Sequence, residues 1–186
     1  MAPIWTPAPP PPTKLGLYRR LSPLAGVHVS PLQLGAMSIG DKWANAGFGA
    51  MDKDSSFKLL DAFFDAGGNF IDTACNYQDE SSEEFLGEWM ETRGIREQMV
   101  IATKVCSFAG YLGFEAVRNS SGRGIQYTTN FKRGRTDIKQ KSAYVGNSMK
   151  SLHNAVEASL KKLRTSYIDV LFVHWVSRPF IRLACM

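Results

Sequence analysis

The chain has little of what marks secreted, membrane-spanning or metal-binding proteins. Only three of its 186 residues are cysteines, with neither the spacing of a metal site nor the density of a disulfide framework. Its longest apolar runs are far shorter than the ~20 residues that a membrane-spanning helix needs. It begins without a basic stretch followed by an apolar segment, so we expect no signal peptide. These absences predict a reduced, cytoplasmic protein with no membrane partner and no metal.

Two motifs of nucleotide and nucleic-acid recognition are also missing. No G-x-G-x-x-G follows the first apolar segment, which argues against a dinucleotide-binding Rossmann fold. The segment Arg118–Arg164 carries eleven Lys and Arg against two acidic residues, a charge that attracts nucleic acid or an anionic cofactor. It lacks the interleaved aromatic residues of a stacking platform and fits no nucleic-acid-binding motif. We interpret it as a solvated basic face and expect no nucleic-acid partner.

Most of the chain has the composition of one folded domain. Apolar residues make up 44% and charged residues 21%, which is enough to build a core and excludes wholesale disorder. The exception is the proline-rich stretch MAPIWTPAPPPPTK, residues 1–14, which predicts an extended, flexible arm. We expect residues 15–186 to form the domain.

After this arm, strand-like and helix-like segments alternate along the chain. Short β segments, broken at Ser-Pro and Ala-Gly pairs, begin the series in residues 18–40. The longer strands expected are Leu32–Ile39, Asn69–Ala74, Gln98–Val105 and Tyr167–Trp175, and the helices expected are Asp54–Gly68, Ser81–Gly94 and Asn147–Ser166. Such alternation predicts an α/β fold, a parallel sheet covered by helices.

The ends and faces of these elements give three further expectations. Asp54 or Ser55 is expected to cap the first helix. The Leu32–Ile39 and Tyr167–Trp175 strands are apolar enough to be buried inside the sheet. In the last helix, apolar residues at helical spacing predict the face that packs on the core: Met149, Leu152, Val156, Leu160 and Leu163.

Polar residues stand at the C-terminal ends of three expected strands. Asp72, Lys104 and His174 each close an apolar strand, and Tyr77 follows Asp72 by one short loop. In parallel α/β folds, this edge of the sheet carries the functional site. Taken singly, each residue has a plainer interpretation: an Asp that caps a turn, a solvated Lys, a packing Tyr, or a His that fills the core. Together they suit one chemical task.

That task is the reduction of a carbonyl group by hydride transfer. The enzyme must protonate the developing alkoxide, and a phenol with a free pKa of ~10 is a reluctant donor near neutrality. An adjacent ammonium lowers the pKa of a phenol, and a carboxylate keeps that ammonium charged and oriented. A His beside the same oxygen orients the substrate. The hydride must come from a cofactor, because no side chain carries one.

The residues of this group stand in stretches that resemble a known family, the aldo-keto reductases. The similar stretches are GGNFIDTACNYQDE, GEWM, VIATK and YVGNSMKSLHNAVEASLKKLRTSYIDVLFVHW. They are most similar to the fungal aryl-alcohol dehydrogenase and norsolorinic acid reductase branch, and the resemblance runs from about Leu15 to Trp175. It implies a (β/α)8 barrel of the TIM type, with NADP(H) bound at the C-terminal edge of the strands.

The resemblance also implies roles for individual residues. The family's catalytic tetrad falls on Asp72, Tyr77, Lys104 and His174. Tyr77 would donate the proton, His174 would bind the substrate, and Asp72 would lie near the nicotinamide ribose. The turn that would border the nicotinamide is Gly35, Ala36 and Met37. The implied function is NADPH-dependent, reversible reduction of an aromatic or polyketide-derived aldehyde or ketone, in fungal secondary metabolism or aromatic aldehyde turnover.

The length of the chain departs from the family pattern. A (β/α)8 barrel typically needs ~250 residues, and 186 residues leave room for its first half only, about four strands and three helices. In the family, the second half supplies the loops that grip the cofactor, so we expect weak NADPH binding. Open strand edges favour pairing with a second copy. The alternative function is therefore a catalytically inactive half-barrel that at most pairs with another chain.

Two segments have no counterpart in the family pattern. Residues 105–126 interrupt it directly after Lys104, and residues 176–186 follow its end. Val105-Cys106 and Val176-Ser177 permit codons that spell intron donor sites, so we interpret both segments as translated introns. A genuine insertion and tail are the alternative, and genomic codons that cannot spell those sites would decide for it. In either case, we expect the insert to move the ammonium of Lys104 out of place.

Overall fold

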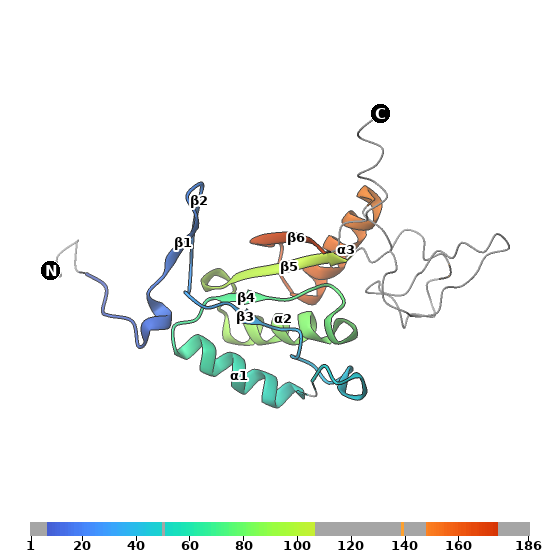
Figure 1. The fold of residues 1–186 in the computed structure, drawn as a ribbon, viewed down its shortest axis with the longest axis horizontal. Coiled ribbons are helices and arrows are strands. Elements are labelled where there is room, and N and C mark those ends of the chain that lie inside the picture. Colours follow the sequence, from blue (N-terminus) through green and yellow to red (C-terminus); the bar gives the residue numbers. More distant parts are fainter. Residues whose placement is uncertain (1–6, 50, 107–138, 140–147, 175–186) are drawn as a thin grey trace.

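The computed structural model describes residues 7–49, 51–106, 139 and 148–174. Its centre is a four-stranded parallel sheet in the order β3-β4-β5-β6 (Figure 1). The strands are β3 (Leu34–Gly35), β4 (Phe70–Asp72), β5 (Val100–Cys106) and β6 (Val170–His174), and the helices between them are α1 (Lys53–Asp65), α2 (Ser81–Arg93) and α3 (Met149–Lys162). Short 3-10 helices are η1 (Lys14–Gly16), η2 (Ala44–Ala46), η3 (Tyr77–Glu80) and η4 (Arg96–Gln98). The predicted alternation and the parallel sheet are confirmed.

One side of the sheet packs on α1 and α2. Ile71 of β4 and Ile101 of β5 are fully buried in a cluster with Leu60, Leu86 and Trp89 of these helices. In Figure 1, both helices run below the strands. Each fully buried side chain of this kind contributes about 1.5–3 kcal/mol. This layer is the largest apolar cluster of the described residues.

The opposite side of the sheet carries a smaller apolar layer. Phe70 and Val100 pair across β4 and β5 and pack with Val29, which belongs to an N-terminal hairpin. Because side chains alternate along a strand, Asp72 and Lys104 lie on the same face as Phe70 and Val100. The polar residues at the strand ends therefore face away from α1 and α2.

The hairpin consists of β1 (Arg19–Ser22) and β2 (Ala25–Val29), paired antiparallel. Asn69, just before β4, ties it to the sheet. The Asn69 Oδ1 accepts the Ser30 N–H at 2.7 Å, and its Nδ2 donates to the His28 carbonyl at 3.0 Å. The predicted short β segments are confirmed, as is their break at a Ser-Pro pair. The break predicted at Ala25 is wrong, because β2 runs through it.

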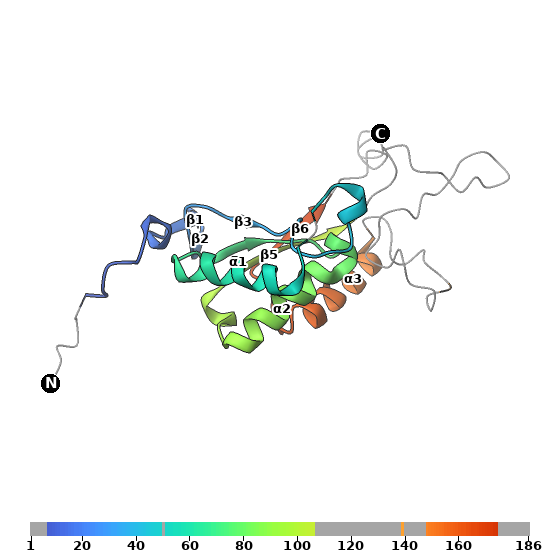
Figure 2. The same cartoon turned by 90° about the horizontal axis from the view of Figure 1, so that it is seen from below.

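The described part of the proline-rich arm leads away from the sheet. Residues 7–13 are exposed and form neither helix nor strand (Figure 2). The arm joins the domain at Thr13, whose Oγ1 donates to the Ala66 carbonyl at 2.6 Å, just after α1. Flexibility of the arm stays a prediction.

The cap of α1 differs from the predicted one. Asp52, rather than Asp54 or Ser55, is the N-cap, and its carboxylate accepts the Ser55 N–H at 2.8 Å. This hydrogen bond from the backbone favours the charged carboxylate and lowers the pKa of Asp52. Three residues capable of capping stand within four positions, so the sequence left the choice open and the backbone conformation decides it.

The face that α3 presents to the core differs in part from the predicted one. Its buried residues are Ser151, Ala155 and Ser159, whereas Met149 is 78% exposed. Leu163, just after the helix, is buried as predicted. The other three apolar residues of the predicted face are half-buried. Small side chains let α3 lie close to its neighbours, and Leu152 and Val156 of the predicted face pack beside them against a buried cluster that includes Cys75 and Val105.

Two strands predicted to lie inside the sheet form its edges. β3 is shorter than predicted and pairs with β4 alone, and Leu32 is exposed before it. β6 pairs with β5 alone, and three of its apolar side chains are exposed: Leu171, Phe172 and Val173. Within the ranges that the structure describes, no strand pairs with the outer edge of β6. The prediction of a buried last strand is therefore wrong, although its place in the strand order is right.

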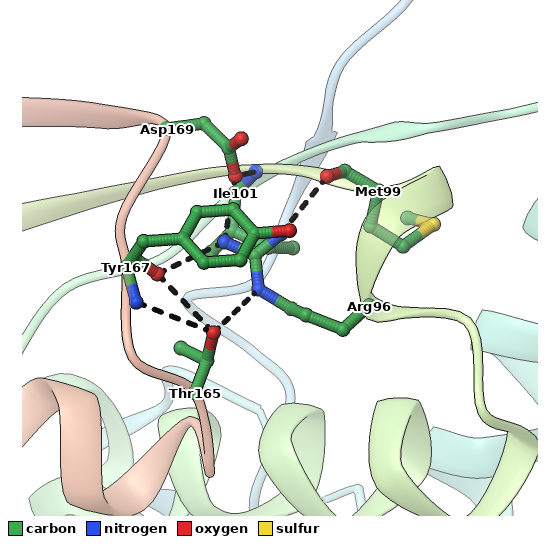
Figure 3. A network of polar contacts seen from close by, with 6 residues as sticks. All are labelled: Arg96, Met99, Ile101, Thr165, Tyr167 and Asp169. Atoms are coloured by element: carbon green, nitrogen blue, oxygen red, sulfur yellow. Dashed lines mark hydrogen bonds and ion pairs between the residues drawn. The ribbon is translucent and has the colours of Figure 1, made fainter.

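A polar network fixes the start of β6 against β5 (Figure 3). The Arg96 guanidinium stacks 3.9 Å from the ring centroid of Tyr167 and pairs with Asp169 Oδ2 at 2.8 Å. The same oxygen of Asp169 accepts the Ile101 N–H at 2.9 Å. Arg96 also donates to the Thr165 hydroxyl and to the carbonyls of Met99 and Tyr167. The network lies at the opposite ends of these strands from Lys104 and His174, and our sequence analysis did not identify it.

No helix within residues 7–49, 51–106 and 148–174 is long and apolar enough to cross a membrane. A cytoplasmic location stays a prediction. Nearly all of the predicted insert, all of the predicted tail and most of the basic segment lie outside the described residues.

Candidate active site

Lys104 joins two of the other predicted site residues. Its Nζ lies 2.6 Å from Asp72 Oδ2 and 3.1 Å from the Tyr77 hydroxyl, and it donates to the Thr73 carbonyl at 2.9 Å. Only 15% of the Lys104 side chain and 23% of the Asp72 side chain are exposed. Opposite charges attract more strongly in such a place than in bulk water. The expectation that the insert moves this ammonium out of place is therefore wrong.

The strand register explains how Lys104 and Asp72 meet. Asp72 pairs with Ala102 across β4 and β5, so Lys104 stands two residues further along β5 on the same face. Its long side chain reaches back over this distance. Tyr77 arrives from η3, where its N–H donates to the carbonyl of Ala74, a residue with no exposed surface. A buried loop therefore holds the phenol over the strand ends.

His174 approaches the same phenol from the end of β6. Its ring lies edge-on to the ring of Tyr77, with centroids 6.1 Å apart and planes at 86°. Burial lowers the pKa of His174, the nearby charge of Lys104 lowers it further, and the carboxylate of Asp72 opposes both. The imidazole is therefore neutral near pH 7. The structure brings all four residues of the predicted tetrad together.

The predicted cofactor turn lies beside Asp72. Gly35 pairs with Asp72 across β3 and β4, and the Ala36 N–H donates to the Asp72 carbonyl at 2.8 Å. A Cβ atom built on Gly35 would meet no atom within 4 Å, so the turn leaves open room there. Ala36 is buried in the core and Met37 is partly exposed. The turn therefore offers a main-chain surface next to the carboxylate.

A buried ion pair that the sequence analysis missed lies behind this site. Glu83 has no exposed surface, and its Oε2 lies 2.7 Å from Lys162 Nζ. Glu83 also accepts hydrogen bonds from the hydroxyls of Thr103 and Ser159, and Lys162 donates to the Cys75 carbonyl at 2.7 Å. In the sequence, Glu83 stands in the first turn of one helix and Lys162 in the last turn of another, where charged residues are common. No periodicity distinguishes a buried charge at a helix end from an exposed one.

Two residues near Tyr77 were also missed, Trp43 and Gln78. The ring of Trp43 lies edge-on to that of Tyr77, with centroids 6.3 Å apart. Gln78 follows Tyr77 and is fully buried. A hydrophilic side chain directly after the catalytic candidate would be placed in a solvated loop from sequence alone.

Comparison with known proteins identifies the family. A model described as the aldo/keto reductase family matches residues 31–183. The chain belongs to the aldo/keto reductase family. The resemblance described from the sequence is thereby confirmed.

Two fungal relatives illustrate the similarity. An aryl-alcohol dehydrogenase [NADP(+)] of Phanerodontia chrysosporium is 59% identical over 174 residues, which cover 92% of this chain and 40% of the relative. The norsolorinic acid reductase stcV of Emericella nidulans is 48% identical over 168 residues, 90% of this chain and 37% of the relative. The chain thus spans about 40% of the length of these curated relatives.

A solved structure supports the same fold. It is described as a putative aldo-keto reductase of Pseudomonas aeruginosa and is 28% identical, with a TM-score of 0.60 over 93% of this chain and 52% of that one. The parallel strands and helices described above correspond to about half of a (β/α)8 barrel. The predicted fold class is confirmed.

Proposed function

We propose that this chain carries the proton-transfer residues of an NADP(H)-dependent reductase that interconverts aromatic or polyketide-derived carbonyl compounds and their alcohols. The observation that carries the proposal is the position of Lys104 Nζ between Asp72 and the hydroxyl of Tyr77. The names of the two fungal relatives support this cofactor and these substrate classes. They also support a role in fungal secondary metabolism or aromatic aldehyde turnover.

Tyr77 is the proton donor in this proposal. Its hydroxyl hydrogen goes to the carbonyl oxygen as that oxygen gains negative charge, and the ammonium of Lys104 stabilises the phenolate left behind. Asp72 holds the ammonium in place through the 2.6 Å contact. His174, as a neutral imidazole, binds the substrate oxygen from the other side and orients the carbonyl.

NADP(H) supplies the hydride when it is bound. The open room beside Gly35, next to the carboxylate of Asp72, fits the flat nicotinamide end of this cofactor. Met37 would border it with its partly exposed side chain, whereas Ala36 is buried and would hold the turn in place through its hydrogen bonds to Asp72 and Ser82. Weak binding by the 186-residue chain stays a prediction, because the family's phosphate-gripping loops are expected in the second half of the barrel.

The test is NADPH-dependent reduction of benzaldehyde by the purified chain and its variants. Tyr77→Phe and Lys104→Met are each expected to lower kcat/KM by about 10²–10⁴-fold, the usual contribution of general acid catalysis. Tyr18→Phe changes an exposed tyrosine before the hairpin and is the matched control. Turnover that survives in Tyr77→Phe would contradict the proposal. An NADPH titration, monitored by tryptophan fluorescence, measures cofactor binding separately from turnover.

The second candidate function is an inactive half-barrel that pairs with another chain. The specific observation in its favour is the exposed apolar edge of β6, where Leu171, Phe172 and Val173 lie. A folded chain that binds no NADPH and reduces no aldehyde would decide for this second function.

A further inference from the structure

Gln78 is a buried polar residue for which the proton-transfer mechanism has no use. Its side chain has no exposed surface, and each of its polar atoms reaches the backbone of the loop between β3 and α1. The Oε1 atom accepts the Trp43 N–H at 2.9 Å, and Nε2 donates to the carbonyls of Met37 at 2.9 Å and Phe48 at 3.2 Å. One amide group thereby fastens both ends and the middle of this loop.

The backbone at Gln78 is held in an unfavourable conformation. Gln78, Asp79 and Glu80 all have positive φ angles, 52°, 49° and 87°. Residues other than glycine avoid positive φ angles, and a run of them keeps this conformation only where surrounding contacts hold it. Here the determinants are the three bonds of the Gln78 amide and the Ser81 hydroxyl, which donates to the Gln78 carbonyl at 2.9 Å.

The loop comes very close to Gln78 at a glycine. Gly40 has a φ of 128°, and a Cβ atom built there would lie 2.5 Å from the Cβ of Gln78. The loop therefore rests directly on the segment that follows Tyr77. Its position over the phenol is set by contact with that segment as well as by hydrogen bonds.

The hydrogen bonds of the Gln78 amide hold the loop so that Trp43 lies next to Tyr77. The two rings lie edge-on with centroids 6.3 Å apart, and Phe48 packs edge-on to Trp43 at 6.0 Å. The indole N–H donates to Asp79 Oδ1 at 3.0 Å, which fixes the rotation of the ring. Trp43 is partly exposed, so part of its surface remains accessible beside the phenol.

We propose that Trp43 is the specificity-determining residue that selects flat aromatic substrates, and that Gln78 is the positioning residue that holds it over Tyr77. The proposal rests on the proposed function, because it takes the Tyr77 hydroxyl as the place where the substrate oxygen binds. An aromatic ring attached to that oxygen then meets the indole, and aromatic pairs prefer edge-on or offset contacts of this kind. A saturated ring of the same size gains no such contact.

The test compares benzyl alcohol with cyclohexylmethanol, which differ in the aromaticity of the ring. Each is titrated into the ¹³C-tyrosine-labelled chain, and the Tyr77 ring resonances, assigned with Tyr77→Phe, report the two dissociation constants. We expect benzyl alcohol to bind about two- to twelvefold more tightly, the range that corresponds to an aromatic pair. Trp43→Leu and Gln78→Ala are expected to bring this ratio to about one, with little change for cyclohexylmethanol.

Gln98→Ala is the matched control, because Gln98 is an exposed glutamine in η4. A general loss of stability weakens binding of both alcohols equally, whereas loss of the contact with the Trp43 ring changes the ratio of their dissociation constants. If Gln78→Ala does not fold, Trp43→Leu alone decides. An unchanged ratio in Trp43→Leu, equal binding of the two alcohols by the parent chain, or no binding of either would overturn the proposal. Because no cofactor or turnover is involved, a failure of the proposed reductase function is seen separately, in the benzaldehyde assay.

Discussion

Lys104 and Lys162 are both lysines with little exposed surface, and their surroundings give them different roles. Lys104 lies beside one carboxylate and a phenol, on the sheet face away from the helices. Lys162 lies between the carboxylates of Glu83 and Glu80 and the Cys75 carbonyl. At the residue scale, the first arrangement suits proton transfer, and the second holds three elements together.

Lys162→Met is expected to destabilise the fold strongly. Glu83 would stay buried without its charged partner, a change that typically costs about 3–5 kcal/mol. Burial alone would lower the pKa of Lys162, but the charges of Glu83 and Glu80 outweigh it and raise the pKa, so Lys162 is charged at pH 7. Urea denaturation measures the loss. The control Lys53→Met breaks an exposed pair with Glu88 and should cost at most about 1 kcal/mol.

His174 should make stability depend on pH just below neutrality. The pKa of His174 is 6.5 in the unfolded chain and lower in the folded chain. At a pH between the folded and unfolded pKa values, the unfolded chain binds the proton and the folded chain does not. Stability is therefore lost as the pH falls through 6.5. His174→Gln should reduce the slope with which the urea midpoint depends on pH between pH 7.5 and 5.5. His153→Gln, at an exposed position of α3, should leave the slope unchanged.

At the scale of elements, the sequence was informative about order and poor about contacts. Alternating strands and helices predict the parallel sheet, and that topology brings Asp72 and Lys104 to one edge. The sequence could not show that Ser151 and Ser159 of α3 lie in the core, because both are polar and yet buried. It also could not show the positive φ at Gln78, because that conformation depends on contacts with a distant loop.

Gly87→Ala tests the contact between α2 and the end of α3. In an isolated helix this change gains about 1 kcal/mol. Here the new Cβ would lie 2.1 Å from the Lys162 carbonyl oxygen and 2.7 Å from the carbonyl carbon of Leu163, both of them backbone atoms. We expect a net loss of about 1–3 kcal/mol instead, measured by thermal or urea denaturation.

Gly26→Ala provides the comparison for this prediction. Gly26 lies in β2, and a Cβ atom there would meet nothing within 4 Å. Alanine at this position should be neutral or stabilise slightly. If Gly87→Ala were as harmless as Gly26→Ala, α2 and α3 would not be in backbone contact.

At the scale of the whole molecule, the described sheet has one well-covered face and two edge strands, the short β3 and the longer β6. α1 and α2 cover the face that carries Ile71 and Ile101. β6 is at the edge, and no described strand pairs with its outer side. Such an edge presents unpaired N–H and C=O groups that can recruit another chain.

The 186-residue chain is expected to self-associate through β6. Val173 is exposed on this strand, so Val173→Lys should place a charge on the edge and shift the equilibrium toward the monomer. Sedimentation velocity over a range of concentrations measures the shift. Leu24→Lys, at the exposed turn of the hairpin, is the matched control. Association that persists unchanged in Val173→Lys would contradict pairing through this edge.

The Arg96 network described at the start of β6 has a consequence for how new activities can arise. Arg96 and Asp169 fasten β5 to β6 at one end of the strands, and Trp43 and Met37 lie at the other. Substitutions in the loop between β3 and α1 leave that fastening untouched. A directed-evolution library confined to exposed side chains of this loop, such as Met37 and Phe48, can therefore sample new carbonyl preferences with few unfolded members, and gene duplicates in nature have the same freedom to diverge.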